Sequence, residues 1–451
     1  MNLSNNIQYF LNNFKIYDNK AAVIWQNESY TYSEILKKIK NWHLKLNEIF
    51  DGAVVGLESD FSPETIAILF TLISKNIIIV PLDNSQSAKN IKKIEIAEID
   101  YLIKIDHLEN VEILNYKKVE SKNLIYDSLI KSATPGLVLF TSGSSGQPKA
   151  AFHNFSKLLL KFQTKRDPLL TINFLLFDHW GGLNTLFHIL SNGGTVVFLE
   201  NRNPDYVCEL IDKWKVELLP TSPTFLNMML LSRAYERHNL KSLKIISYGS
   251  EAMPESVLQK MNKFFPNTKL QQTYGLIELG VMSTKSKDNE SLWVKIGGNG
   301  YETRVIDGLL EIKSDSAMIG YLNAESPYTE DGWFRTGDAV EVDGEYFKIL
   351  GRKSELINVG GEKVYPQEVE NIIILIDNVL DVQVYGEKHP FTGNIVCANI
   401  LINLEIDKDI VKRSIKSICK EKLEPFKNPI KINFVYKPFY TNRFKKERFR
   451  I

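Results

Sequence analysis

The sequence predicts an α/β protein with a large N-terminal domain of mostly parallel sheets, a β-rich subdomain and a small α+β C-terminal domain. Short β-branched runs alternate with helix-length amphipathic stretches up to about residue 295. Strands that alternate with helices are typical of parallel sheets covered by helices. The chain has 451 residues, which is more than one hydrophobic core organises, so two or more domains are expected.

The first elements are predicted from apolar runs and capping residues. Helices are expected at 31–46 and 62–74. The first opens on Thr31 with Glu34 three residues on, the pattern of a capping box, and the second opens on Ser62 with an acidic residue nearby. Buried strands are expected at 21–25, 53–58, 77–82 and 136–142.

The most apolar stretch, 65–83, is interrupted by Ser74, Lys75 and Asn76 before it reaches the length of a membrane span. It predicts a helix, a turn and a buried strand, and no membrane span is expected.

The later part of the chain changes character. The alternation of strands and helices continues at 193–223 and 243–250. From about 295 to 351, short strands joined by Gly and Asp turns predict a β-rich subdomain. A separate α+β pattern follows. We therefore expect an N-terminal domain over 1–351 and a C-terminal domain over 352–451.

Composition excludes several classes of protein. The 55 basic and 54 acidic residues give a net charge of +1, so there is no basic field for nucleic acid, and no nucleic-acid partner is expected. Cys208, Cys397 and Cys419 lie far apart in the sequence and do not have the spacing of metal ligands. We therefore expect them to be reduced thiols of a cytosolic protein. The N-terminus lacks the pattern of a signal peptide, which also favours a cytoplasmic location.

The first candidate site is the stretch TSGSSGQPK, which follows a predicted strand. Its backbone N–H groups and hydroxyls suit an anion, and its lysine adds positive charge. It is not a Walker loop, because Ala150 stands where the magnesium-binding hydroxyl would be. The candidate phosphate-binding residues are Thr141, Ser142, Gly143, Ser144, Ser145, Gly146 and Lys149.

The order of these residues resembles the phosphate-binding signature of the adenylate-forming (AMP-binding) superfamily, closest to acyl- and aryl-CoA synthetases and stand-alone adenylation domains. Ser145 stands for a Thr and Ala150 for a Gly of that signature. Further motifs follow in the family's order. QTYGLIE resembles Tyr-Gly-x-Thr-Glu, which implies that Tyr274 and Gly275 lie at the adenine and that Glu278 binds Mg²⁺ on the nucleotide phosphates.

Two more stretches carry the resemblance, and a third is expected to line the site. GWFRTGD implies that Asp338 accepts the ribose hydroxyls, and GRKSELINVGG implies a ribose contact from Arg352. In the same segment, Ser354 takes the hinge position of a mobile C-terminal domain, and Gly360 and Gly361 line the channel for a thiol. YGSEAM adds Gly249 and Ser250 as residues that line the site.

The basic C-terminal stretch YTNRFKKERFR resembles the family's Thr-x-x-Gly-Lys-x-x-Arg. The match places Lys445 at the position of the catalytic lysine, with Phe444 in place of Gly and Lys446 as an adjacent competitor. A solvated basic tail is the alternative interpretation.

The stretch FDHWGGL resembles a segment of acyl- and aryl-CoA synthetases that places His179 at the mouth of the acid pocket. A core histidine is the alternative. Asp178 leaves a further possibility open, because peptide-synthetase adenylation domains use Phe-Asp here to hold a substrate amine.

The resemblance implies an acid–thiol ligase. A carboxylic acid is activated with ATP and Mg²⁺ to an acyl-adenylate, which passes to the thiol of CoA or of the phosphopantetheine on a separate acyl carrier protein. A stand-alone amino-acid adenylating enzyme is one alternative. Another is a degenerate relative that binds nucleotide without turnover, because Ile277, Ser354 and Phe444 depart from the family pattern.

Overall fold

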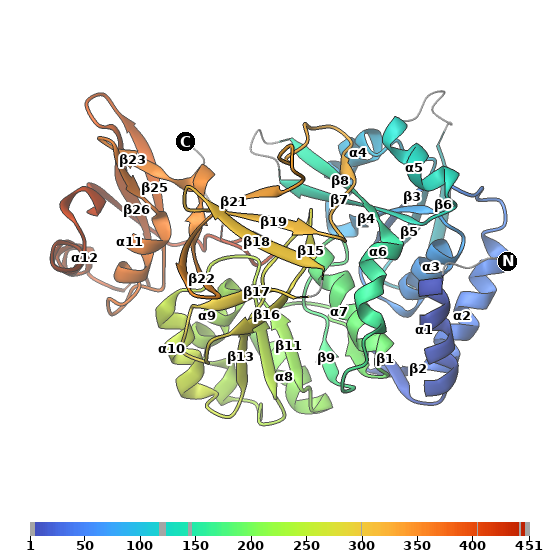
Figure 1. Cartoon of the computed structure of the whole chain (residues 1–451). Helices are drawn as coiled ribbons and strands as arrows, with labels where there is room; N and C mark the ends of the chain where they lie inside the picture. Colours follow the sequence, from blue (N-terminus) through green and yellow to red (C-terminus); the bar gives the residue numbers. More distant parts are fainter. Residues whose placement is uncertain are drawn as a thin grey trace.

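The computed structural model of the chain describes residues 5–116, 123–142, 147–298, 300–403, 405–441 and 443–446. In these residues, two seven-stranded sheets form the N-terminal part of the molecule, and a six-stranded and a five-stranded sheet follow toward the C-terminus (Figure 1). The α/β class predicted from the sequence is confirmed.

The first large sheet is parallel except at one edge. Its strand order is β13-β12-β11-β9-β10-β1-β2, and the β1–β2 pair is antiparallel. Its strands are β1 (Ala21–Trp25), β2 (Glu28–Thr31), β9 (Leu170–Ile172), β10 (Thr195–Val197), β11 (Leu218–Thr221), β12 (Ile245–Tyr248) and β13 (Lys269–Gln272).

The second large sheet is mixed, whereas mostly parallel sheets are predicted from the sequence. In the order β20-β8-β7-β4-β3-β5-β6, the strands from β7 to β5 are parallel and the outer pairs are antiparallel. The chain that leaves β7 returns directly as β8, and so short a connection permits only antiparallel pairing. The strands are β3 (Val54–Ser59), β4 (Ile78–Asp83), β5 (Tyr101–Ile105), β6 (Val111–Asn115), β7 (Gly136–Ser142), β8 (Pro148–Asn154) and β20 (Gly320–Tyr321).

Helices cover both large sheets. The predicted capping box is present at α2. The Thr31 side chain accepts from the backbone N–H of Glu34, and the Glu34 carboxylate accepts from the backbone N–H of Thr31. At α3, Ser62 caps the backbone of Thr65. The helices of this part are α1 (Asn5–Tyr17), α2 (Tyr32–Lys45), α3 (Pro63–Ser74), α4 (Ser87–Ile96), α5 (Asp127–Lys131), α6 (Phe155–Leu159), α7 (Trp180–Ser191), α8 (Pro204–Trp214), α9 (Pro223–Ser232) and α10 (Glu255–Phe264).

An aromatic layer fills the space between the two large sheets. Phe10 of α1, Phe70 of α3 and Phe187 of α7 are fully buried, with ring centroids 5.5–5.7 Å apart in each pair. The same core cluster includes Val23 of β1 and Val55 of β3, so it joins one sheet to the other. The stretch predicted to be helix, turn and strand at 65–83 supplies α3 and β4 to this region.

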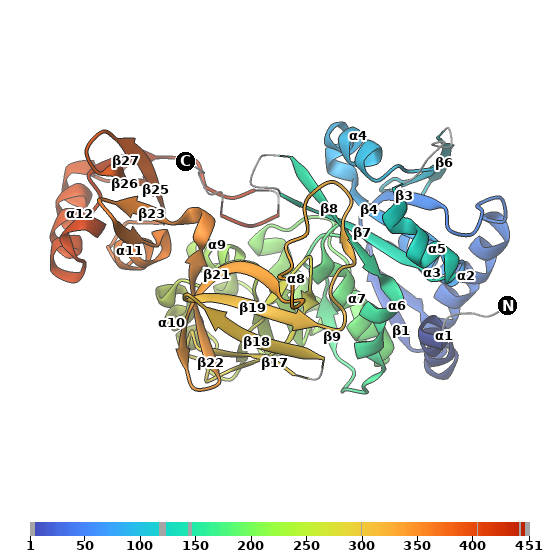
Figure 2. The ribbon, with the colours of Figure 1, turned by 45° about the horizontal axis from the view of Figure 1, so that its top comes forward.

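The C-terminal half contains the two smaller sheets (Figures 1 and 2). The antiparallel six-stranded sheet is made of β16 (Ser283–Ser286), β17 (Val294–Gly297), β18 (Tyr301–Ile306), β19 (Leu309–Ser314), β21 (Phe334–Asp343) and β22 (Tyr346–Arg352). The small pair β14 (Gly275–Leu276) and β15 (Gly280–Val281) precedes it.

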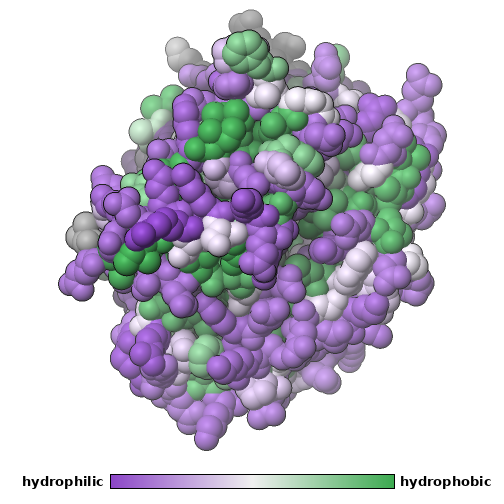
Figure 3. All heavy atoms as spheres, turned by 90° about the vertical axis from the view of Figure 1, so that its left-hand side faces the viewer, coloured by the Kyte–Doolittle hydropathy of each residue, from purple (hydrophilic) through white to green (hydrophobic). Residues whose placement is uncertain are grey.

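The last sheet has its own core. It contains β23 (Ile357–Val359), β24 (Glu362–Val364), β25 (Asp381–His389), β26 (Gly393–Leu401) and β27 (Lys431–Val435), with α11 (Pro366–Ile373) and α12 (Lys408–Lys422). Figure 3 looks onto this part of the molecule, where hydrophilic side chains predominate and apolar ones gather in small groups. The domain division at 351/352 stays a prediction.

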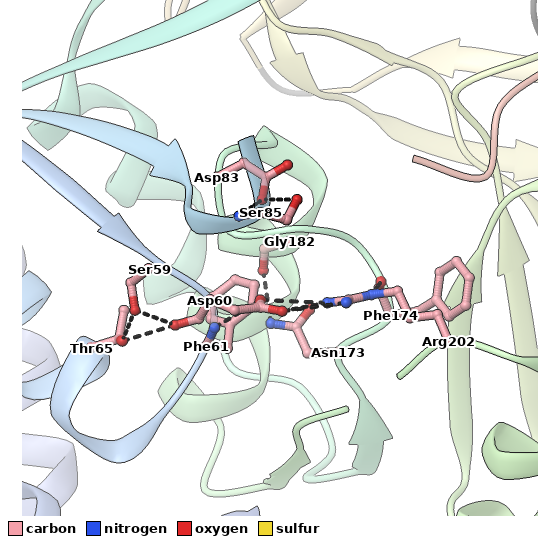
Figure 4. A network of polar contacts seen from close by, with 10 residues as sticks. All are labelled: Ser59, Asp60, Phe61, Thr65, Asp83, Ser85, Asn173, Phe174, Gly182 and Arg202. Atoms are coloured by element: carbon pink, nitrogen blue, oxygen red, sulfur yellow. Dashed lines mark hydrogen bonds and ion pairs between the residues drawn. The ribbon is translucent and has the colours of Figure 1, made fainter. Parts of the chain in front are cut away.

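A polar junction fixes the strand ends near the centre of the molecule (Figure 4). Arg202 donates from Nε to the carbonyl of Phe174 at 2.7 Å and pairs with Asp60 at 3.2 Å between Nη2 and Oδ2. Asp60 follows β3 of the second sheet, whereas Phe174 follows β9 of the first. The junction therefore ties the two sheets together where their strands end.

Cys208, Cys397 and Cys419 are free thiols and are buried. Among the described residues, no helix is long and apolar enough to cross a membrane.

Of the two glycines that follow Trp180, Gly182 is required by close backbone approach at the start of α7. A Cβ on Gly182 would lie 2.3 Å from the carbonyl oxygen of Leu176, and one on Gly181 would lie 2.4 Å from Cδ1 of Leu175. The backbone oxygen cannot move away as a flexible side chain can.

We expect Gly182→Ala to lower the melting temperature strongly, because the added methyl overlaps a backbone atom and overpacking costs about 1–3 kcal/mol or more. Gly320→Ala is the control, since Gly320 is not in the left-handed region and a Cβ there would meet only the side-chain tip Cδ1 of Ile125, which can move away. Thermal denaturation checks the pair. Equal melting temperatures for the two variants would contradict the packing argument.

Candidate active site

A cavity of about 1380 Å³ opens at the ends of the first sheet's strands. Thr221, Gly249 and Gln272 line it from the ends of β11, β12 and β13. The other side is closed by the end of β22 and by the C-terminal segment, defined here as the described residues from 440 to 446. Ligands of α/β proteins bind beyond the carboxyl ends of parallel strands, so this is the candidate active site.

A buried carboxylate forms one wall of the cavity. Asp338 on β21 lies opposite Arg352 on β22, and Arg352 Nε is 3.2 Å from Asp338 Oδ1. The Tyr274 hydroxyl donates to Asp338 Oδ2 at 2.5 Å. Burial raises the pKa of the Asp338 carboxyl, while the Arg352 guanidinium and the Tyr274 hydroxyl act in the opposite direction. Three residues predicted to surround the nucleoside thus lie together.

The candidate metal ligand lies on a second wall. Glu278 Oε1 accepts from the Tyr321 hydroxyl at 2.6 Å, and Lys149 Nζ lies 5.4 Å from the centre of the Tyr321 ring. No cluster of three or more His, Cys, Asp or Glu side chains suited to a metal occurs in the part of the chain that the structure describes. One carboxylate fits Mg²⁺ that is held mainly by substrate phosphates.

The predicted phosphate-binding stretch is described only at its two ends. Thr141 lines the cavity and pairs with Lys149 across β7 and β8. Ser142 is the last residue of β7. Gly143, Ser144, Ser145 and Gly146 lie outside the described residues.

Lys445 lines the cavity together with Arg352 and Glu251. The pKa of the Lys445 ammonium is lowered to about 8, chiefly by burial and also by the nearby Arg443 guanidinium, while Glu251 acts in the opposite direction. Lys446 also lines the cavity, but its Nζ is paired with a carboxylate, 3.0 Å from Asp381 Oδ1. No such ion pair is found for Lys445 among the described residues.

His179 lines the cavity and also caps a helix. Its Nδ1 accepts from the backbone N–H of Gly181 at 3.1 Å, at the N-terminus of α7. Burial lowers the pKa of the imidazole, and the positive charges of Lys445 and Arg443 lower it further. The ring is therefore neutral, and its proton lies on Nε2. The capping role was not predicted from the sequence, although a residue just before an apolar helical run is a candidate cap.

Asp178 has partners from its own chain. Its Oδ2 lies 2.5 Å from Arg443 Nη2 and 3.5 Å from Lys93 Nζ, and the side chain is only 2% exposed. The sequence left open a role for Asp178 in holding a substrate amine. In the structure, two cations of the protein already neutralise this carboxylate.

The remaining predicted residues divide into two groups. Gly249, Ser250, Gly275 and Ser354 line the cavity. A Cβ on Gly249 would lie 2.3 Å from Thr273 Oγ1, so only glycine fits there. Gly360 and Gly361 do not line it; they form the β23–β24 turn, where their φ angles of +62° and +99° suit glycine.

Comparison with known proteins places this geometry in context. A family model described as AMP-binding enzyme matches residues 10–322, and one described as AMP-binding enzyme C-terminal domain matches residues 368–443. The indoleacetate–CoA ligase of Aromatoleum aromaticum is 26% identical over 444 residues, which cover 86% of each chain. The 2-succinylbenzoate–CoA ligase of Bacillus pumilus is 26% identical over 463 residues, which cover 92% of this chain and 91% of the relative.

A solved structure of an anthranilate CoA ligase, AuaEII, in complex with anthranoyl-AMP superposes with a TM-score of 0.84 at 21% identity. It covers 98% of this chain, and 96% of that structure is matched. The expected fold is thereby confirmed along the chain.

The cap at α7 predicts that His179→Ala lowers stability by about 1 kcal/mol, the usual effect of losing an N-cap. His179→Asn should retain nearly all of the stability, because an asparagine oxygen can accept the same N–H. Chemical denaturation of the three proteins checks this. If His179→Asn is as unstable as His179→Ala, the hydrogen bond to Gly181 does not stabilise the helix.

Proposed function

The chain belongs to the AMP-binding enzyme family, and from this premise we propose that it joins a carboxylic acid to a thiol with ATP as the energy source. In the first half-reaction, a carboxylate oxygen of the acid attacks the α-phosphorus, and pyrophosphate leaves. In the second, the thiol sulfur attacks the acyl carbon, and AMP leaves. The observation that carries this proposal is the meeting of Asp338, Arg352 and Lys445 at one cavity.

The nucleoside end is assigned to the buried carboxylate. Asp338 would accept hydrogen bonds from the ribose hydroxyls, and the Arg352 guanidinium opposes the rise of its pKa that burial causes. Tyr274 would lie against the adenine while its hydroxyl keeps the carboxylate oriented. Charge-assisted bonds of this kind are stronger than neutral ones, so they fix the nucleotide in one register.

The phosphate end is assigned to the positive groups. The Lys445 ammonium would offset charge at the α-phosphate, and Thr141 to Lys149 would hold the β- and γ-phosphates. Glu278 would hold Mg²⁺, which would supply positive charge to offset that of the nucleotide phosphates. His179, whose imidazole ring is neutral, would orient the acid without adding charge. Catalysis then consists of positioning and charge neutralisation.

The thiol is assigned to CoA, because the relatives named above are CoA ligases. A phosphopantetheine on a separate acyl carrier protein is the alternative donor. Gly360 and Gly361 lie away from the cavity, so we propose that the C-terminal domain, 352–451, turns about Ser354 to bring them to it. We place the reaction in the cytoplasm, where buried cysteines stay reduced.

Two other functions give different results in one experiment, ATP–pyrophosphate exchange over a panel of carboxylic and amino acids. An acid–thiol ligase should show exchange with one class of carboxylic acid and then form a thioester with CoA. An amino-acid adenylating enzyme would respond to amino acids, which the neutralised Asp178 makes unfavourable. A nucleotide-binding relative without turnover would show no exchange with any acid.

Asp338→Asn should raise the KM for ATP in the exchange assay at least about tenfold, because a hydrogen bond to a charged group is worth about 1.5–3 kcal/mol. The amide can still accept from Tyr274, so the melting temperature should remain close to that of the original protein. A variant with normal KM for ATP would contradict the assignment of Asp338 to the ribose.

The pKa of Lys445, about 8, predicts the pH dependence of adenylation. The ammonium is the active form, so kcat/KM for ATP should be constant below this pKa and fall as pH rises through about 8. Lys445→Arg should remove this alkaline fall, since a guanidinium stays charged, even if its rate is low. A fall that persists unchanged in Lys445→Arg would assign the titration to another group.

A further inference from the structure

We propose that Arg443 and Phe444 are positioning residues that hold Lys445 at the nucleotide site, and that Asp178 and the pair Phe174–Phe225 receive them. The inference rests on the proposed function of Lys445. We call Arg443 and Phe444 the latch. Phe444 stands where the motif Thr-x-x-Gly-Lys has a flexible glycine before the lysine.

The backbone of Phe444 is in a conformation that a phenylalanine rarely adopts. Its φ is +51°, in the left-handed region that favours glycine. Residues in that region persist only when their surroundings hold them there. A tight turn supplies part of this support, because Phe444 N–H donates to the Thr441 carbonyl and Thr441 N–H donates to the Lys445 carbonyl, both at 2.9 Å.

The ring of Phe444 supplies the rest. It lies 5.2 Å from Phe174 and 6.0 Å from Phe225 between ring centres, and it stacks on Tyr440 at 6.1 Å and 15°. Phe174 and Phe225 are buried core residues that contact each other at 4.3 Å. The C-terminal segment thus places one aromatic ring against the core of the large N-terminal part, a contact that glycine cannot make.

The receiving side is itself held rigidly. The carbonyl of Phe174 accepts from Arg202, which is paired with Asp60 in the polar junction (Figure 4). Ser222, the N-cap of α9, donates from Oγ to the Phe444 carbonyl at 2.5 Å. The ring and the carbonyl of Phe444 therefore meet fixed partners.

Arg443 adds a buried ion pair beside this aromatic contact. Asp178 is almost fully buried, and among the described residues its other ion pair is the longer one to Lys93. Removal of one member of a buried pair is strongly unfavourable, because it leaves the other charge uncompensated. The pair therefore favours the arrangement in which the C-terminal segment is seated.

Lys446 holds the other side of Lys445. Its backbone N–H donates to Glu251 Oε2 at 2.9 Å, and its Nζ donates to the Val382 carbonyl at 2.7 Å in the C-terminal part. Lys445 is thus placed between two attached neighbours. Its ammonium enters the cavity as a consequence of the contacts that its two neighbours make.

The latch has opposite consequences for the two half-reactions. Adenylate formation needs Lys445 in the cavity, so the latch favours it. Thiol entry needs Gly360 and Gly361 at the same cavity, so the latch must first release. A variant without the latch should populate the seated arrangement less, which slows the first half-reaction but not the second.

The test uses the full-length protein with Phe444→Gly, Phe444→Leu and Phe391→Gly. Phe391 is 92% exposed and serves as the control for loss of a phenylalanine. Phe444→Gly should lower kcat for ATP–pyrophosphate exchange at least about tenfold with little change in KM for ATP, and thioester formation from supplied acyl-adenylate and CoA should be unchanged or faster. Phe444→Leu should restore most of the exchange, and Phe391→Gly should match the original protein. If both half-reactions fall together, or if Phe444→Gly exchanges normally, the proposal is overturned.

A double-mutant cycle tests the ion pair. Arg443→Gln and Asp178→Asn should each lower exchange, and the double variant should be no worse than the poorer single one, because each removes the same contact. Fully additive losses would show that Arg443 does not act through Asp178.

A readout without turnover separates the latch from the proposed function. Trypsin cleavage at Arg443 and Lys445, followed by mass spectrometry and normalised to the unfolded chain, should be at least about ten times faster in Phe444→Gly. Faster cleavage of Phe444→Gly would support the latch even if the original protein showed no exchange with any acid, and that lack of exchange would refute the ligase. Unchanged cleavage would refute the latch, whatever the activity.

Discussion

The aromatic layer between the two seven-stranded sheets determines where everything else in the molecule lies. Phe10, Phe70 and Phe187 pack edge-on or tilted against each other and leave the sheets one well-packed arrangement. In that arrangement, the ends of β3 and β9 come close enough for Asp60 and Arg202 to join them. The cavity at the strand ends and the core residues that receive the C-terminal segment follow from this packing.

The parts of the site that the sequence predicts well are those encoded by short stretches. Asp338 and Arg352 belong to adjacent antiparallel strands, and the short turn at 344–345 between their two motifs sets the pairing. The capping box at Thr31 and Glu34 is equally local. Local patterns fix local geometry, so a motif and its spacing are enough to bring these side chains together.

The contacts that the sequence does not reveal join distant segments. Arg443 and Asp178 are 265 residues apart, and nothing near either residue indicates the other. From the sequence, Phe444 is only a departure from a motif that has glycine at this position. The rings that hold Phe444 in place, Phe174 and Phe225, belong to the core of the N-terminal part, far away in the sequence. The β7–β8 hairpin was also missed, since apolar content does not distinguish parallel from antiparallel pairing.

The three buried cysteines have a consequence for chemical selectivity. Burial raises the pKa of Cys208 to about 12 and those of Cys397 and Cys419 to about 11. A thiol that remains protonated is a poor nucleophile, because the thiolate is the reactive form. A protein that generates a reactive mixed anhydride would acylate itself if its own sulfur atoms were exposed and ionised. Here the cysteine thiols are buried and protonated. They therefore do not compete with the thiol substrate for the activated acyl group.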